Sequence, residues 1–70
     1  DAANAFREVK SYLHSAVGQA QVMVQRAADR ADMRAASVFD ARAAVLFRAA
    51  MIAAAMTQDA LREADVAKAQ

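Results

Sequence analysis

The chain has 70 residues and a formal net charge of +1, with no cysteine and one histidine. This composition excludes disulfides and thiolate metal sites, and it argues against the one-signed field that general nucleic-acid or anionic-membrane binding needs. Alanine supplies 22 of the 41 hydrophobic residues, and the chain has one glycine and no proline. We therefore expect an all-helical protein with few large core side chains.

The first expected element is an amphipathic helix over residues 2–28. Its apolar residues recur at alternating steps of three and four, which is the spacing of one helix face. They are Phe6, Val9, Leu13, Ala16, Ala20, Met23 and Ala27, and Tyr12, Val17 and Val24 widen the stripe. Gly18 lies inside this helix, where we interpret it as a small residue that allows close helix packing. The alternative is a hinge that divides the helix.

A break is expected over residues 29–34, because the first apolar stripe does not continue in phase into the second half of the chain. Continued by the same steps, it would fall on Arg30 and Arg34. Asp32 is the expected N-cap of the second helix, and Asp29 is the other candidate. Neither glycine nor proline marks the break, so one continuous, bent helix is the alternative.

The second expected helix covers residues 35–68 and carries its own stripe at the same spacing. The stripe consists of Phe39, Ala43, Leu46, Ala50, Ala53, Thr57, Ala60, Ala64 and Ala67, with Val38, Val45, Ile52 and Met56 on one flank and Phe47 and Met51 on the other. The sequence therefore predicts a single domain over residues 1–70, a helical hairpin of two long alanine-rich helices.

Part of the second helix, AAVLFRAAMIAAAM at residues 43–56, is apolar nearly all round its axis. A hairpin covers only one side of such a helix, so we expect the other sides to contact further copies of the chain. The result would be a multi-helix bundle, or a filament if the contacts do not close. The predicted interface residues are Phe39, Ala43, Val45, Leu46, Phe47, Ala50, Ile52, Ala53 and Met56.

Two groups of charged residues carry further hypotheses. Arg48, the charged residue inside the apolar run, is expected to reach solvent at the edge of the bundle, or to pair with Asp40 or with a carboxylate of another subunit. Arg26, Arg30 and Arg34 lie four residues apart and would form a ridge that suits a polyanion. Nearby aspartates offset that ridge, so a solvated face is the preferred interpretation and nucleic acid is not the expected partner.

No residues form a recognisable catalytic, cofactor-binding or metal-binding motif, and His14 has no ligating neighbours. We therefore expect a structural protein without enzymatic activity, which associates with itself or with a partner helix of another protein. A small membrane-associated subunit of the pilus or secretion kind is the alternative, since the apolar helix could contact lipid. A regulatory binding module that uses the arginine ridge is the third hypothesis. The sequence does not indicate a compartment.

Overall fold

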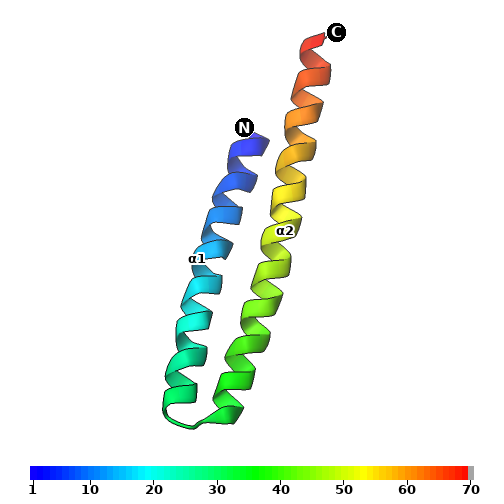
Figure 1. The fold of residues 1–70 in the computed structure, drawn as a ribbon. Coiled ribbons are helices and arrows are strands. Elements are labelled where there is room, and N and C mark those ends of the chain that lie inside the picture. Colours follow the sequence, from blue (N-terminus) through cyan, green and yellow to red (C-terminus); the bar gives the residue numbers. More distant parts are fainter. Residues whose placement is uncertain (70) are drawn as a thin grey trace.

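The computed structural model describes residues 1–69 and shows two antiparallel helices side by side in one layer (Figure 1). Helix α1 spans Ala2–Asp29 and helix α2 spans Met33–Ala69. Together they form a rod with Cα extents of 60 × 13 × 10 Å. The prediction of an all-α hairpin is confirmed, and the alternative of one continuous helix is wrong because the chain reverses between the two helices.

Both helices begin at an aspartate whose side chain accepts a hydrogen bond from a backbone amide of the first turn. The carboxylate of Asp1 accepts from the Asn4 N–H at 2.8 Å, and that of Asp32 accepts from the Ala35 N–H at 3.1 Å. Asp32 is therefore the N-cap of α2, as predicted. Asp29, the other candidate, accepts instead from the Gln25 side-chain amide at 2.9 Å.

The turn between the helices is closed by two backbone hydrogen bonds. The Ala31 N–H donates to the Ala28 carbonyl and the Asp32 N–H donates to the Ala27 carbonyl, each at 2.9 Å. This pattern is a Schellman motif, in which the residue after the C-cap adopts a left-handed conformation. Here Ala31 has a φ of 58°. Glycine usually occupies this position because it has no Cβ to clash, so the motif lacks its usual sequence signal.

We call the residues of α2 that pack against α1 the inner stripe. They are Ala36, Phe39, Ala43, Leu46, Ala50, Ala53, Thr57 and Ala60, all buried or half-buried. Seven of these eight belong to the predicted second stripe. Ala64 and Ala67 continue its spacing but are exposed, because α2 extends past the start of α1 (Figure 1).

The face of α1 that packs against α2 differs from the predicted first stripe. The buried and half-buried positions at steps of three and four are Ala3, Phe6, Lys10, Leu13, Val17, Ala20, Val24 and Ala27. Val17 therefore lies at the centre of the contact, whereas Val9 and Tyr12 are exposed. The other eight predicted residues of this stripe and its flanks are buried or half-buried, so the prediction was wrong only at Val9 and Tyr12. Half-buried Lys10 takes the position between Phe6 and Leu13 that the prediction gave to Val9.

Gly18 is exposed within an uninterrupted α1, so it is not a hinge. A Cβ added at this position would meet no other atom within 4 Å. The predicted close packing at Gly18 is therefore not present between the two helices of the hairpin.

The core between the helices is thin. Among residues 1–69, the buried side chains are alanines apart from Val17 and Thr57, and no large side chain is fully buried. The Thr57 hydroxyl donates to the Ala53 carbonyl at 2.9 Å, so it is satisfied within its own helix. Alanine allows the two backbones to approach closely but removes little apolar area from water, which limits the stability that the hairpin gains by itself.

Candidate interaction surface

The structure divides the nine predicted interface residues into two groups. Five belong to the inner stripe and contact α1 within the same chain: Phe39, Ala43, Leu46, Ala50 and Ala53. Four are exposed, with 70% of Val45, 51% of Phe47, 57% of Ile52 and 44% of Met56 accessible to solvent. Only this second group remains free to contact another molecule.

Val45, Ile52 and Met56 belong to a second row of residues on α2, which we call the outer stripe. Its members follow steps of three and four and therefore share one helix face. They are Ala35, Val38, Arg42, Val45, Ala49, Ile52, Met56, Asp59, Glu63 and Val66. All are exposed except Ala35 and Ala49, which are half-buried.

The outer stripe borders a shallow groove between the helices. The groove has a volume of about 340 Å³, and its lining includes Tyr12, Ala16 and Met23 of α1 and Phe39, Arg42 and Leu46 of α2. Farther along the same side, a second hollow of about 320 Å³ brings Phe6 of α1 beside Met56 and Asp59 of α2. The apolar surface of the outer stripe therefore continues onto α1 through Tyr12 and Ala16.

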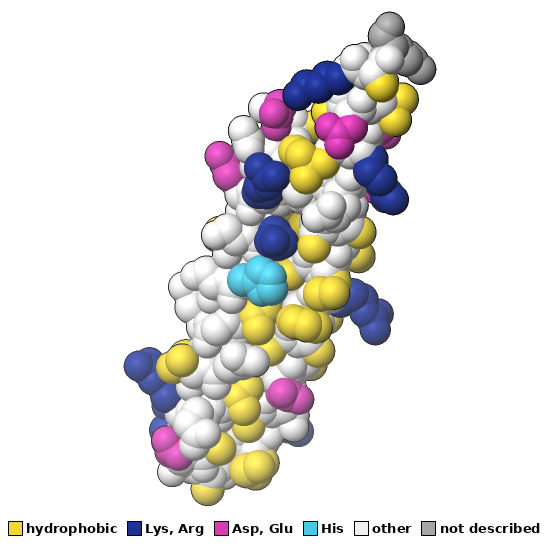
Figure 2. Space-filling view, turned by 45° about the horizontal axis from the view of Figure 1, so that its top comes forward, with side chains coloured by type: hydrophobic (Ala, Val, Ile, Leu, Met, Phe, Trp, Pro, Cys, Tyr) yellow, Lys and Arg dark blue, Asp and Glu magenta, His cyan; other side chains and the backbone are white. Residues whose placement is uncertain are grey.

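The two helices differ in what they expose. Figure 2 shows one face of the hairpin, on which hydrophobic side chains gather along α2, whereas few of them are seen on the side formed by α1. Phe47 and Met51 are exposed on α2, whereas the outward positions of α1 include Ser11, Ser15 and Gln21. The surface suited to contact another apolar surface is thus carried mainly by α2.

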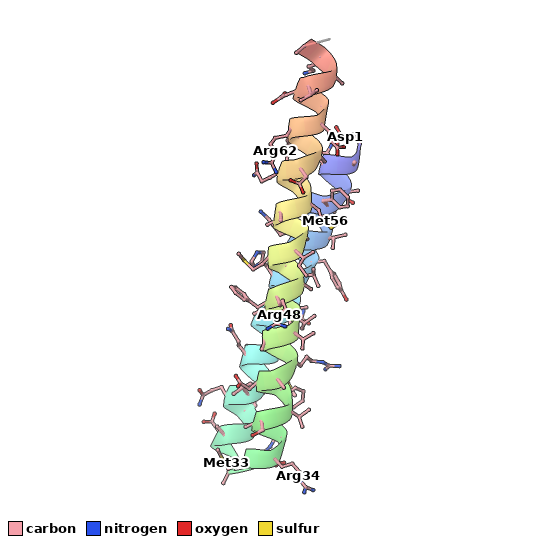
Figure 3. All side chains as sticks on the ribbon, turned by 90° about the vertical axis from the view of Figure 1, so that its right-hand side faces the viewer. Asp1, Met33, Arg34, Arg48, Met56 and Arg62 are labelled. Carbon is pink, nitrogen blue, oxygen red and sulfur yellow. The ribbon has the colours of Figure 1, made fainter. Side chains whose placement is uncertain are left out.

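Arg48 and Asp40 are not paired with one another in this chain. Both are exposed, and among residues 1–69 the one salt bridge joins Arg62 to Asp59. Eight residues separate the two along α2, which is a rise of about 12 Å. Arg48 lies on the side of α2 turned away from α1 (Figure 3). Within the single chain it is a solvated residue, and its pairing with another subunit stays a prediction.

The three arginines proposed as a ridge lie on different elements. Arg26 is in the last turns of α1, Arg30 is its C-cap and Arg34 is in the first turn of α2. Because the chain reverses between Arg30 and Arg34, they do not form the predicted ridge on one helix. Asp29 and Asp32 lie at the same end of the rod, so the positive charge there is partly offset.

Within residues 1–69, no three His, Asp or Glu side chains come together in a way that could hold a metal ion. Neither helix, over the same residues, combines the length and apolar character that a membrane span requires. Comparison with protein-family models, with curated proteins and with solved structures finds no match to this chain.

Proposed function

We propose that this chain is a structural subunit that assembles with copies of itself through the exposed apolar surface of α2, without catalysis. One observation supports this function above the others: the buried positions of the hairpin are mostly alanines, while most of its larger apolar side chains are exposed. Among residues 1–69, eleven large hydrophobic side chains are exposed, and seven of them are on α2 beyond its first turn. Surface of this kind marks a contact with another molecule.

The accessible surface area supports the same conclusion. The hairpin exposes 5309 Å². A folded monomeric protein of this mass exposes roughly 4,200 Å², so the excess is roughly 1,100 Å². A stable protein interface buries about 800 Å² on each partner. Association with one further copy would therefore remove most of this excess, about 800 of roughly 1,100 Å² per chain.

Sedimentation velocity over a hundredfold range of protein concentration tests this proposal, with each sample measured alone and with lipid vesicles. We expect a discrete oligomer that dissociates on dilution and is unaffected by vesicles. Growth into large polymers would indicate the open form of the same self-assembly. A species that stays monomeric at every concentration would contradict the proposal, and a monomer that moves onto vesicles would support the membrane-associated alternative.

A further inference from the structure

Over its six central residues, Arg42 to Asp59, the outer stripe of α2 has the same order of side-chain types from either end. Farther out the order differs, because Val38 is apolar and Glu63 is acidic. Ala49 and Ile52 lie at its centre, and an apolar residue follows on each side, Val45 before them and Met56 after them. The next residues outward are Arg42 on one side and Asp59 on the other, which carry opposite charges. An apolar centre is thus flanked by one positive and one negative group at equal distances.

This order has a direct consequence for pairing with a second copy. In a two-fold interface, residue i of one copy contacts residue j of the other, and residue j contacts residue i. An antiparallel copy centred between Ala49 and Ile52 places Val45 against Met56 of the second copy. It also places Arg42 against Asp59 of the second copy, and this ion pair occurs twice. We infer that α2 pairs with α2 of a second copy in this antiparallel register, an inference that rests on the proposed self-assembly.

A parallel pairing of the same stripes would bring like charges together. Arg42 would lie against Arg42 of the second copy, and Asp59 and Glu63 would each lie against their own equivalents. Like charges placed directly opposite one another are destabilising and act against the wrong arrangement. The charge pattern therefore selects the antiparallel orientation, while the apolar centre supplies the attraction.

The length of α2 fits this register. The two-fold axis falls between Ala49 and Ile52, and the midpoint of Met33–Ala69 is residue 51. The two copies of α2 therefore overlap over their whole length. The part of α2 that α1 leaves uncovered, residues 62–69, would then lie beside the turn end of the second copy. Val66, which is exposed in the single chain, would contact Ala35 of that copy.

Helix α1 contributes at the same level of the rod. Counted along the chain, Tyr12 and residue 51 are equally far from the turn, to within one residue, so they lie side by side in the two antiparallel helices. Tyr12 is 73% exposed and lines the groove beside Leu46 and Arg42. A second hairpin laid on this side would cover Tyr12 with its own Tyr12, so the interface would include both helices and complete a four-helix bundle.

Charge reversal tests the orientation. Arg42→Glu and Asp59→Arg should each weaken self-association about tenfold in sedimentation equilibrium, because each turns two attractive contacts per dimer into repulsive ones. An equal mixture of the two variants should regain the wild-type affinity, since every ion pair is restored between unlike chains. The double variant R42E/D59R should regain it alone. Asp40→Arg is the matched control, because Asp40 is exposed and lies two residues from both Val38 and Arg42, on the opposite side of α2 from the outer stripe. It should change the affinity by less than about twofold.

The Asp59→Arg change also removes the intrachain salt bridge between Asp59 and Arg62. The double variant and the mixture separate the two effects. The intrachain bridge stays absent from every chain of the double variant and from the D59R chains of the mixture, while the intermolecular pairs return in both. Affinity that stays low in both the mixture and the double variant would overturn the inference.

Disulfide cross-linking tests the register. The chain has no native cysteine, so only the introduced thiols can form a disulfide. Oxidising a mixture of V45C and M56C chains should give a disulfide dimer of one chain of each kind. V45C alone should cross-link poorly, because eleven residues of offset place the two thiols about 16 Å apart along the axis. Efficient V45C self-cross-linking in a confirmed oligomer would overturn the antiparallel register while leaving self-assembly intact. A wild-type chain that never associates would overturn both.

Discussion

The inner and outer stripes of α2 follow the same spacing along one helix but differ in the size and charge of their side chains. The inner stripe is mainly alanine, interrupted by Phe39, Leu46 and Thr57. The outer stripe has branched or long apolar side chains at its centre and charged residues farther out. In a self-sufficient small domain the larger side chains would be inside. In this hairpin, alanines bring the two helices close together, and many of the larger apolar side chains of α2 stay exposed, where we propose that another copy covers them.

The difference between the stripes also separates two roles. Small side chains allow close approach of α1 and α2 and so set the geometry of the hairpin, but they supply little hydrophobic stabilisation. Most of the outer stripe is exposed in the single chain, so we expect the larger part of its stabilising effect to depend on association. Changes in the inner stripe should therefore alter the stability of the hairpin itself, and changes in the outer stripe should alter its affinity for other copies.

Ile52→Asp should have the largest effect, because it breaks the outer stripe at its centre. Ile52 is 57% exposed in the single chain, and two losses of its burial per dimer come to about 2–4 kcal/mol before the desolvation of the carboxylates. We expect the dissociation constant to rise by about 100-fold in sedimentation equilibrium. Asp40→Arg, on the opposite side of α2 from the outer stripe, should leave it within about threefold. Equal effects of the two changes would show that the outer stripe is not the interface.

Ala50→Leu should destabilise the hairpin, because the larger side chain does not fit at this position of the inner stripe. Ala50 is completely buried between the helices, and adding three carbon atoms at such a position costs about 1–3 kcal/mol. We expect a lower midpoint in thermal unfolding followed by circular dichroism. Ala41→Leu adds the same atoms at an exposed position of α2 and should change the free energy of unfolding by less than about 0.5 kcal/mol. If Ala50→Leu also left the unfolding midpoint unchanged, this result would contradict the close approach of the two helices at Ala50.

Ala31→Gly should stabilise the hairpin by about 1 kcal/mol, because glycine adopts the left-handed conformation without the Cβ clash that alanine has there. Ala31 has a φ of 58°. The change acts on the turn that holds the two stripes in one chain. Ala41→Gly, inside α2, is the control and should destabilise by about the same amount, since glycine weakens a helix interior. The same sign for both changes in thermal unfolding would contradict the Schellman turn.

Gly18→Ala should have the smallest effect, a stabilisation of about 0.5–1 kcal/mol from helix propensity. The added methyl group meets no neighbour in the hairpin, and Gly18 is not part of the side that carries the outer stripe. We therefore expect a slightly higher unfolding midpoint and an unchanged dissociation constant. A loss of association on this change would show that another copy approaches the backbone at Gly18.

Much of the fold follows from the sequence, because alanine-rich helices with a regular apolar spacing have few competing structures. Seven of the eight residues of the inner stripe of α2 were predicted, and Ala36 was not. Asp32 was identified as a cap because it precedes an apolar run in an otherwise unmarked break. The contact face of α1 was predicted except at Val9 and Tyr12, because half-buried Lys10 occupies a position that periodicity assigns to an apolar residue.

The interaction surface was only partly predictable. When a helix is apolar on several sides, spacing alone does not tell which side meets the partner helix in the same chain. Ala43, Ala50 and Ala53 were therefore grouped with Val45 and Ile52, although the structure places the alanines inside the hairpin. The predicted arginine ridge is absent for a related reason. Residues four apart share one face only within a single helix, and the turn separates Arg34 from Arg26.

The most direct test of the account is the dependence of the thermal unfolding midpoint on protein concentration. If the outer stripe supplies stability that the thin core lacks, unfolding is coupled to dissociation, and mass action requires the midpoint to rise with concentration. We expect a clear rise, of several degrees, over a hundredfold range of concentration. A midpoint that does not change over this range would show that the hairpin folds by itself, and it would contradict the central claim that a second copy completes it.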